Sequence, residues 1–215
     1  MQNFDEIWPF NNLRLESPRL LLRPVQDGDI AGLVKATLAG IHEPDRMPFD
    51  VPWTRRSPEE MARGTAQNVW LARARITPQK WNVSFAVLQG GEVIGRQDVV
   101  ADNFSELKTV ETGSWLTRDR QGQGLGKEMR AAVLFWAFDH LGAEYAITAA
   151  MAWNQASQGV SRSMGYRPNG TFRKLTSPGE VQESIRFRLA RGEFMRPDWQ
   201  LKVSGHEAVA PLLGA

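Results

Sequence analysis

Cysteine is absent from all 215 residues of this chain. Its absence excludes disulfide bonds, thiolate nucleophiles and cysteine-ligated metal sites, and it suits a reducing compartment. Long apolar runs are missing as well, because no stretch approaches the roughly 18 residues of a membrane-spanning helix. The first twelve residues are polar and acidic, which is not the pattern of a signal peptide. We therefore expect a cytoplasmic protein without a membrane partner.

The chain also has little net charge. Lysine and arginine total 26 against 24 aspartates and glutamates, so the formal net charge is only +2. Nucleic-acid-binding domains usually carry a dense basic stripe, and the chain has none. The sequence therefore argues against a nucleic-acid partner but permits a small anionic ligand. A lone His42 beside two carboxylates is weak evidence for a metal site, and we expect no metal.

Composition and length predict one domain over residues 1–215, because 42% of the residues are hydrophobic and the chain is long enough to bury a core. Residues 1–12 are expected to form an N-terminal tail and residues 198–215 a C-terminal extension. The extension is ambiguous from its sequence, which suits either an extra strand or an ordered tail.

Hydrophobic periodicity predicts alternating strands and helices. Ser57, Pro58 and Glu60 have the spacing of a capping box with proline at the first helical position, and Gly90-Gly91 between two β-rich runs predicts a hairpin. Strands are expected at residues 19–25, 81–89, 92–100, 109–116, 144–151, 165–172 and 181–190. Helices are expected at residues 27–40, at 57–75, after Gly126 and at 156–165. This order predicts an α/β (α+β) fold in which helices cover a mixed sheet.

Three glycines alternate between a predicted strand and a predicted helix, at Gly122, Gly124 and Gly126. Glycine turns that lead into helices bind phosphate, because backbone N–H groups can approach its oxygens and the helix N-terminus carries partial positive charge. A Walker loop is excluded, since Glu128 follows Lys127 where serine or threonine is required. The dinucleotide fingerprint is excluded by lysine at its last glycine position. The loop therefore predicts a different phosphate ligand or only a tight turn.

Three motifs carry a family resemblance. The spacing Gln121-x-x-Gly124-x-Gly126 resembles the coenzyme A (CoA) pyrophosphate loop, [Gln/Arg]-x-x-Gly-x-[Gly/Ala], of the GCN5-related N-acetyltransferase (GNAT) superfamily. The stretch VETGSWLTRDRQGQG is similar to the E-x-G-x-W-L-x-x-x-x-[Arg/Gln]-G-x-G signature of its RimJ/RimL-type branch. Downstream, Asn154 and Ser157 followed by a Gly-Tyr pair resemble the N-x-x-S…G-[Phe/Tyr] segment of the same branch.

The resemblance implies the GNAT fold, a mixed, mostly antiparallel central sheet flanked by helices, in which two splayed strands bind acyl-CoA. It implies an N-acyltransferase that moves an acetyl or succinyl group from acetyl-CoA or succinyl-CoA to a primary amine of a small molecule or protein. The resemblance also implies that the amine attacks directly in a ternary complex and that the protein is a homodimer. The stretch IHEPDRMPFDVPWTR (41–55) resembles a loop of a mycobacterial-type succinyltransferase group. The alternative is a non-catalytic acyl-CoA binding or sensing module with the same fold.

The resemblance also implies roles for individual residues. Glu111 is the implied general base, directly or through water, and Ser157 the implied hydrogen-bond donor to the leaving sulfur. Glu111 could equally be a surface carboxylate, and Asn154 and Ser157 could be helix-terminal residues. The implied CoA-binding residues are Trp115, Leu116, Thr117, Gln121, Gly122, Gln123, Gly124, Leu125, Gly126, Lys127, Asn154 and Ser157. Arg118, Arg120, Lys127 and Arg162 are candidates for neutralising the remaining phosphate charge.

Acidic and aromatic residues gather where such folds build an acceptor pocket. Asp45, Phe49, Asp50 and Trp53 follow the first predicted helix, and this mixture suits a cationic amine. Alternatively, Phe49 and Trp53 are core or dimer contacts.

Overall fold

The computed structural model describes residues 3–177 and 179–215. Its strands are β1 (Arg14–Glu16), β2 (Leu21–Pro24), β3 (Lys80–Gln89), β4 (Glu92–Asp102), β5 (Thr109–Leu116), β6 (Tyr145–Met151), β7 (Arg167–Ser177), β8 (Glu180–Ala190) and β9 (Lys202–Ser204). Its α-helices are α1 (Phe4–Ile7), α2 (Asp27–Leu38), α3 (Pro58–Ala74), α4 (Phe104–Leu107), α5 (Leu125–Phe135) and α6 (Gln155–Ser163). A π-helical turn, Trp136–His140, continues α5.

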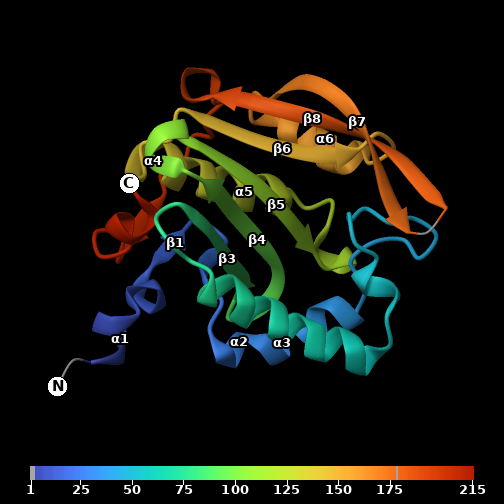
Figure 1. Cartoon of the computed structure of the whole chain (residues 1–215), viewed down its shortest axis with the longest axis horizontal. Helices are drawn as coiled ribbons and strands as arrows, with labels where there is room; N and C mark the ends of the chain where they lie inside the picture. Colours follow the sequence, from blue (N-terminus) through green and yellow to red (C-terminus); the bar gives the residue numbers. More distant parts are fainter. Residues whose placement is uncertain (1–2, 178) are drawn as a thin grey trace.

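The strands form one sheet in the order β7-β8-β6-β5-β4-β3-β2-β1-β9. Every neighbouring pair is antiparallel except β5 and β6, which run parallel. In Figure 1, α2 and α3 lie together on one side of the sheet, apart from α5. The expected mixed, mostly antiparallel sheet flanked by helices is therefore confirmed.

The capping box predicted for the second long helix is present at the start of α3. The Ser57 hydroxyl accepts from the Glu60 backbone N–H at 3.2 Å, and the Glu60 carboxylate accepts from the Ser57 N–H at 3.0 Å. Pro58 occupies the first helical position. These two hydrogen bonds satisfy N–H groups that the helix itself leaves without partners, so the sequence fixes this boundary locally.

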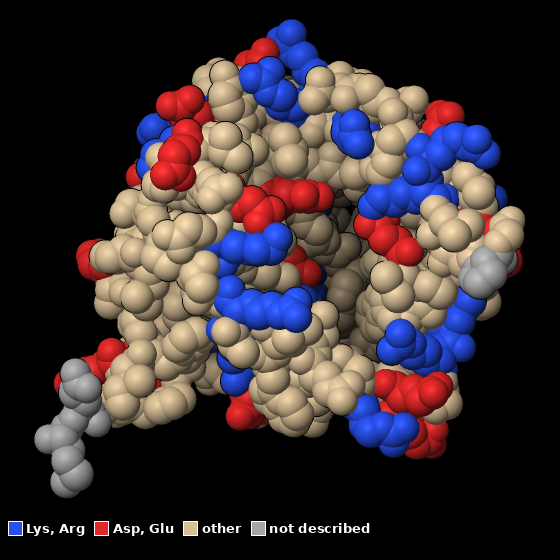
Figure 2. Space-filling view, viewed as in Figure 1, with Lys and Arg blue, Asp and Glu red and all other residues tan. Residues whose placement is uncertain are grey.

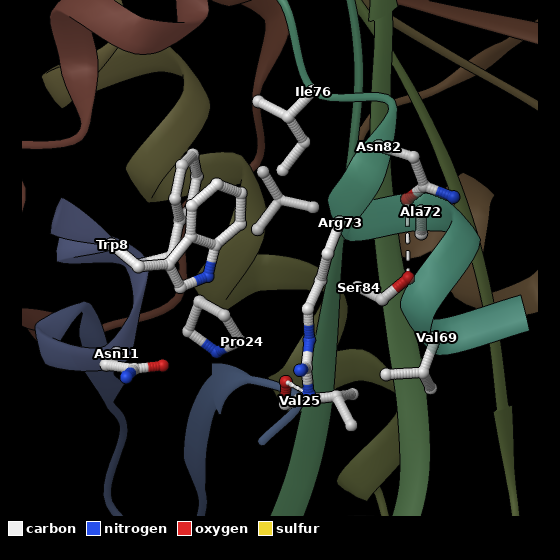
Figure 3. Close-up of a pocket in the computed structure, with 12 residues that line it drawn as sticks. Trp8, Asn11, Pro24, Val25, Val69, Ala72, Arg73, Ile76, Asn82 and Ser84 are labelled. Atoms are coloured by element: carbon white, nitrogen blue, oxygen red, sulfur yellow. Dashed lines mark hydrogen bonds between the residues drawn. The ribbon is translucent and has the colours of Figure 1, made fainter. Parts of the chain in front are cut away.

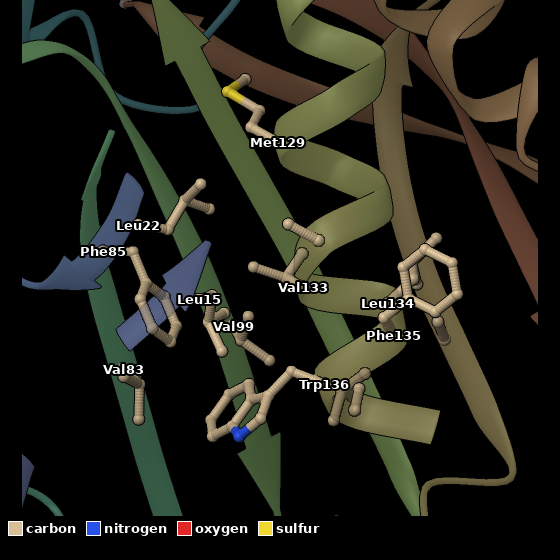
Figure 4. Packing of buried hydrophobic residues seen from close by; sticks show 14 of the residues in the cluster. Leu15, Leu22, Val83, Phe85, Val99, Met129, Val133, Leu134, Phe135 and Trp136 are labelled. Atoms are coloured by element: carbon tan, nitrogen blue, oxygen red, sulfur yellow. The ribbon is translucent and has the colours of Figure 1, made fainter. Parts of the chain in front are cut away.

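The main core lies between α5 and one face of the sheet (Figure 4). Val133 comes from α5 and Trp136 from the π-helical turn that continues it, and the strands contribute Phe85 and Val99. Trp136 is fully buried, and its ring meets that of Phe85 edge-on with centroids 5.4 Å apart. This packing fixes the position of α5 and therefore of the glycine turn at its N-terminus.

Both chain ends pack on the sheet. The segment expected as an N-terminal tail places Phe10 in the core with 2% exposure. The expected C-terminal extension supplies β9, which pairs with β1, and the Leu213 carbonyl accepts a 2.9 Å hydrogen bond from the indole of Trp81. Within residues 3–177 and 179–215, the helices are too short or too polar to cross a bilayer.

Candidate active site

The parallel strands β5 and β6 form a fork. They pair only from Thr109 with Tyr145 to Glu111 with Ile147 and then diverge. At the closed end the Thr148 hydroxyl donates to the Thr112 carbonyl at 2.7 Å. A cleft of about 1270 Å³ includes the diverging residues of both strands among its lining, and Figure 2 shows a hollow in this face of the molecule. The volume is large enough for a ligand of cofactor size.

The free backbone groups of the fork follow from strand register. The Thr117 N–H donates to the Ile94 carbonyl at 2.9 Å, so Thr117 and Trp115 face β4. Because hydrogen-bonding direction alternates along an antiparallel strand, the N–H groups of Ser114 and Leu116 face the fork. Of residues 115–117, whose backbone we expect to bind a ligand, only Leu116 has its amide facing the fork, since the amides of Trp115 and Thr117 face β4. The Ser114 amide also faces the fork.

The glycine turn at the start of α5 requires glycine at two positions. Gly122 and Gly124 have φ of 73° and 81°, in the left-handed region that side chains disfavour. Gly124 caps α5, so the unpaired N–H groups of the first helical turn point out of the loop. Both glycines, with Gly126 and Lys127, line the cleft. The turn can hold an anion against the helix N-terminus.

A brace between distant parts of the chain supports this turn, and sequence reasoning missed it. The Arg19 guanidinium donates to the buried Glu128 carboxylate at 2.6 Å and to the Gln123 carbonyl at 3.0 Å. The Ser17 hydroxyl donates to the other oxygen of Glu128 at 2.8 Å. A carboxylate in the first turn of a phosphate-binding helix would repel phosphate unless a cation already paired with it. The position of Glu128 in the sequence could therefore have indicated that a basic residue pairs with it.

The four basic residues expected to neutralise phosphate charge differ in whether another side chain already pairs with them. Arg118 pairs with Glu43 at 2.5 Å and Arg120 with Glu92 at 3.2 Å. Arg162 donates to the side chain of Gln158 at 3.0 Å and does not line the cleft. Lys127 lines the cleft and forms no ion pair with any described residue. Of these four residues, Lys127 is therefore the one placed to meet a phosphate.

Two carboxylates, those of Asp98 on β4 and Glu111 on β5, lie on the same face of the sheet where these two strands pair. Glu111 is opposite Val100, and Asp98 is opposite Gly113. Asp98 accepts hydrogen bonds from Arg96 at 2.8 Å and from Ser84 at 2.5 Å, whereas the exposed Glu111 carboxylate has no side-chain partner among the described residues. Sequence reasoning did not select Asp98. Both residues line the cleft, and of these two carboxylates that of Glu111 has no side-chain hydrogen-bond partner among the described residues.

The start of α6 closes the fork on the β6 side. Asn154 is the N-cap, and its side-chain oxygen accepts from the Ser157 N–H at 3.1 Å. Asn154 is therefore a helix cap, and both residues also line the cleft. No described residue forms a hydrogen bond with the Ser157 hydroxyl, so this group is available to a ligand.

Aromatic rings line the cleft entrance. Phe49 lies 5.2 Å from Trp53, and Trp53 lies 6.3 Å from Trp115, between ring centroids. Asp50 also lines the cleft and pairs with Lys174 of β7, whereas the exposed Asp45 does not line it. The structure thus brings three of the four predicted acceptor residues to the cleft.

The loop that carries these aromatic residues reaches across to the β7–β8 hairpin. Beside the Asp50–Lys174 pair, Arg55 binds Glu180 at 3.0 Å. In Figure 1 this loop lies next to the tip of the hairpin. The two pairs therefore fix one wall of the cleft against the other.

A second, much smaller pocket lies between α3, β2 and the N-terminal segment (Figure 3). Its volume is about 20 Å³, enough for about one water molecule. Arg73 crosses it and donates to the Val25 carbonyl at 2.8 Å. In the described part of the chain, histidine and carboxylate side chains form no group of three that could hold a metal ion.

Comparison with known proteins identifies relatives of this architecture. The family model described as "Acetyltransferase (GNAT) domain" matches residues 19–167. Mycobacterium smegmatis RimJ, solved in complex with CoA-disulfide, superposes with a TM-score of 0.72 at 19% identity, covering 95% of each chain. RimL, a ribosomal L7/L12 alpha-N-protein acetyltransferase solved with CoA, gives a TM-score of 0.65 at 19% identity over 81% of this chain and 95% of its own. The Vibrio fischeri ribosomal-protein-S5-alanine acetyltransferase gives 0.63 at 17% identity, over 87% and 98%. At these identities the likeness is one of fold.

Proposed function

Because this chain belongs to the acetyltransferase (GNAT) domain family, we propose that it is an acyl-CoA-dependent N-acyltransferase that acts on a primary amine. The donor is acetyl-CoA or succinyl-CoA, and the amine attacks it directly in a ternary complex. The observation that carries this proposal is the open fork of β5 and β6 beside the positive-φ glycine turn of α5.

The chain offers groups that fit each part of such a donor. Of the backbone N–H groups of residues 121–127, which we expect to bind the pyrophosphate, those of Gln121 and Lys127 already donate to the carbonyls of Arg118 and Gly124. The N–H groups within residues 122–126, together with the Lys127 ammonium, would bind it. The amides of Ser114 and Leu116 face the fork and would bind the pantetheine chain and the acyl carbonyl oxygen. The remaining predicted CoA contacts lie on the same three elements: Trp115 and Thr117 at the end of β5, the residues of the glycine turn, and Asn154 and Ser157 at the start of α6.

The reaction needs a proton acceptor and a donor to the leaving group. The acyl-CoA supplies a thioester; the amine nitrogen bonds to its carbonyl carbon, and the carbon–sulfur bond breaks. Glu111 takes the amine proton, directly or through water, because its carboxylate is free whereas Asp98 is already paired with Arg96. Ser157 donates a hydrogen bond to the departing thiolate. The products are an amide and free CoA.

An amine that is partly neutral suits this site. A lysine-type amine has a pKa near about 10.4, whereas an α-amine titrates near about 8, so the α-amine loses its proton far more readily at neutral pH. RimL is an α-N-acetyltransferase of ribosomal protein L7/L12, and the Vibrio fischeri enzyme is an acetyltransferase of ribosomal protein S5. A protein N-terminus is therefore the favoured acceptor, with Phe49 and Trp53 offering ring faces to its cationic form.

The competing function is a non-catalytic module that binds or senses acyl-CoA. Glu111→Gln separates the two, with Glu144→Gln as the matched control because Glu144 is exposed and does not line the cleft. For an enzyme we expect unchanged acyl-CoA affinity and turnover reduced about 100-fold or more in Glu111→Gln, the size of a general-base contribution. Wild-type protein that binds acyl-CoA without consuming it in an acceptor screen would favour the sensing module.

A further inference from the structure

Arg130 is a buried cation that forms no ion pair with any described residue. It lies on α5 with 3% exposure and also lines the cleft. One terminal nitrogen, Nη2, donates to the Ser114 hydroxyl at 3.2 Å. Within the described residues, Nε and Nη1 have no hydrogen-bond partner. Buried donors without partners are rare, so these two groups call for a ligand or a bound water.

Among the described residues, no carboxylate forms an ion pair with Arg130. Its close polar neighbours are the hydroxyls of Ser114 and Tyr166. Burial lowers the pKa of Arg130 and raises the pKa of Tyr166 above its ordinary value, so the Tyr166 hydroxyl can approach the guanidinium but does not neutralise its charge. Arginine stays protonated in proteins, so the guanidinium keeps its charge. Leaving a buried cation unpaired is strongly unfavourable. A ligand that carries a carboxylate would remove this penalty.

Arg130 reaches the fork at Ser114, because its Nη2 donates to the Ser114 hydroxyl and both residues line the cleft. The Ser114 amide faces the fork, where the pantetheine chain and acyl group of a bound donor would lie. Thr112 and Ser114 also line the cleft on its β5 side. A lone methyl group would meet mainly polar atoms here, whereas a longer chain could pack its methylenes on Met129 and present an anion to Arg130.

We propose that Arg130 binds the terminal carboxylate of a dicarboxylic acyl group, which makes it a specificity-determining residue for donors such as succinyl-CoA. The inference deepens the proposed acyltransferase function and rests on it. The proposal rests on the two guanidinium nitrogens without partners and on the position of Arg130 at the fork. It does not depend on the sequence resemblance of residues 41–55 to succinyltransferases.

The test compares donors on the wild-type protein first. Succinyl-CoA and butyryl-CoA have acyl chains of equal carbon number and differ in the terminal carboxylate. We expect kcat/KM for succinyl-CoA to exceed that for butyryl-CoA and acetyl-CoA by about 10- to 100-fold, the contribution of a hydrogen bond to a charged group. Equal or lower values for succinyl-CoA would overturn the proposal without any variant having to fold.

Variants then assign the preference to Arg130. Arg130→Met should reduce the ratio of kcat/KM for succinyl-CoA to that for acetyl-CoA by about 10- to 100-fold, and Arg130→Lys should retain part of the ratio. An unchanged ratio, with equal losses for both donors, would mean that Arg130 only holds a water or the pantetheine chain, and the proposal would be wrong. Activity with acetyl-CoA alone would refute the carboxylate site and leave the acyltransferase intact, whereas failure of every CoA thioester to bind would refute both.

Discussion

Replacing Gly124 with alanine should destabilise the protein, whereas the same change at Gly126 should not. Gly124 has φ of 81°, and a left-handed conformation costs an L-residue about 1–2 kcal/mol. An added Cβ would also lie 3.4 Å from the Arg19 guanidinium. Gly126 is helical, and a Cβ there would meet Val160 and Leu116 at ordinary distances of 3.7 and 3.9 Å. Because alanine favours a helix over glycine by about 1 kcal/mol, Gly126→Ala should be neutral or stabilising.

The two variants should therefore differ in unfolding free energy by about 2–3 kcal/mol. For a chain of this length, that corresponds to about 4–12 °C in Tm. The assay is thermal unfolding without ligand, repeated with free CoA to measure how far the ligand raises Tm. Gly124→Ala should lose most of the CoA-induced rise, and Gly126→Ala should keep it. Equal Tm values for the two variants, or a lower Tm for Gly126→Ala, would refute the reasoning from backbone conformation.

Two further predictions concern stability. Arg19→Met leaves the buried Glu128 carboxylate without its charged partner and should lower the unfolding free energy by about 1–3 kcal/mol in urea denaturation; a change below about 0.5 kcal/mol would mean that the brace does not act. Burial and the neighbouring His140 lower the pKa of His206, and its Nδ1 accepts a 3.3 Å hydrogen bond from the Trp136 indole. A lowered folded-state pKa means that this stability is fully present above the unfolded pKa of about 6.5 and is lost as pH falls through the lower folded value. Urea denaturation at pH 7.5 and at pH 5 should show a smaller acid-side decline in His206→Gln than in wild type, and equal declines would contradict the assignment.

Local patterns predicted the elements that position the site. The capping box at Ser57 marked the start of α3, and the alternating glycines marked the turn before α5. The mixed sheet followed from the order of strands and helices. These features depend on neighbouring residues, so a single sequence contains their signal.

Features that depend on distant contacts were not predictable. The Arg19–Glu128 brace joins residues 109 positions apart. The three-residue strand β1 pairs with both β2 and β9. The sequence left residues 198–215 open between an extra strand and an ordered tail, and the pairing of β9 with β1 decides for a strand. Strand register also decides which amides can bind a ligand: the Ser114 amide faces the fork, whereas the Thr117 amide donates to the Ile94 carbonyl of β4. Register is set by the whole sheet and not by the motif that contains these residues.

The proposed function requires that the fork and the glycine turn bind a CoA thioester. Thermal unfolding tests this binding: the Tm of the wild-type protein is measured with free CoA, acetyl-CoA and succinyl-CoA, while free thiol is followed in the presence of an amine acceptor. At a hundredfold excess over Kd, binding should add about 2.7 kcal/mol of stability, which is about 5–11 °C in Tm for this length. We expect a rise with all three ligands and thiol release with at least one thioester. No rise in Tm with any of them would show that the glycine turn is only a turn and that the account is wrong.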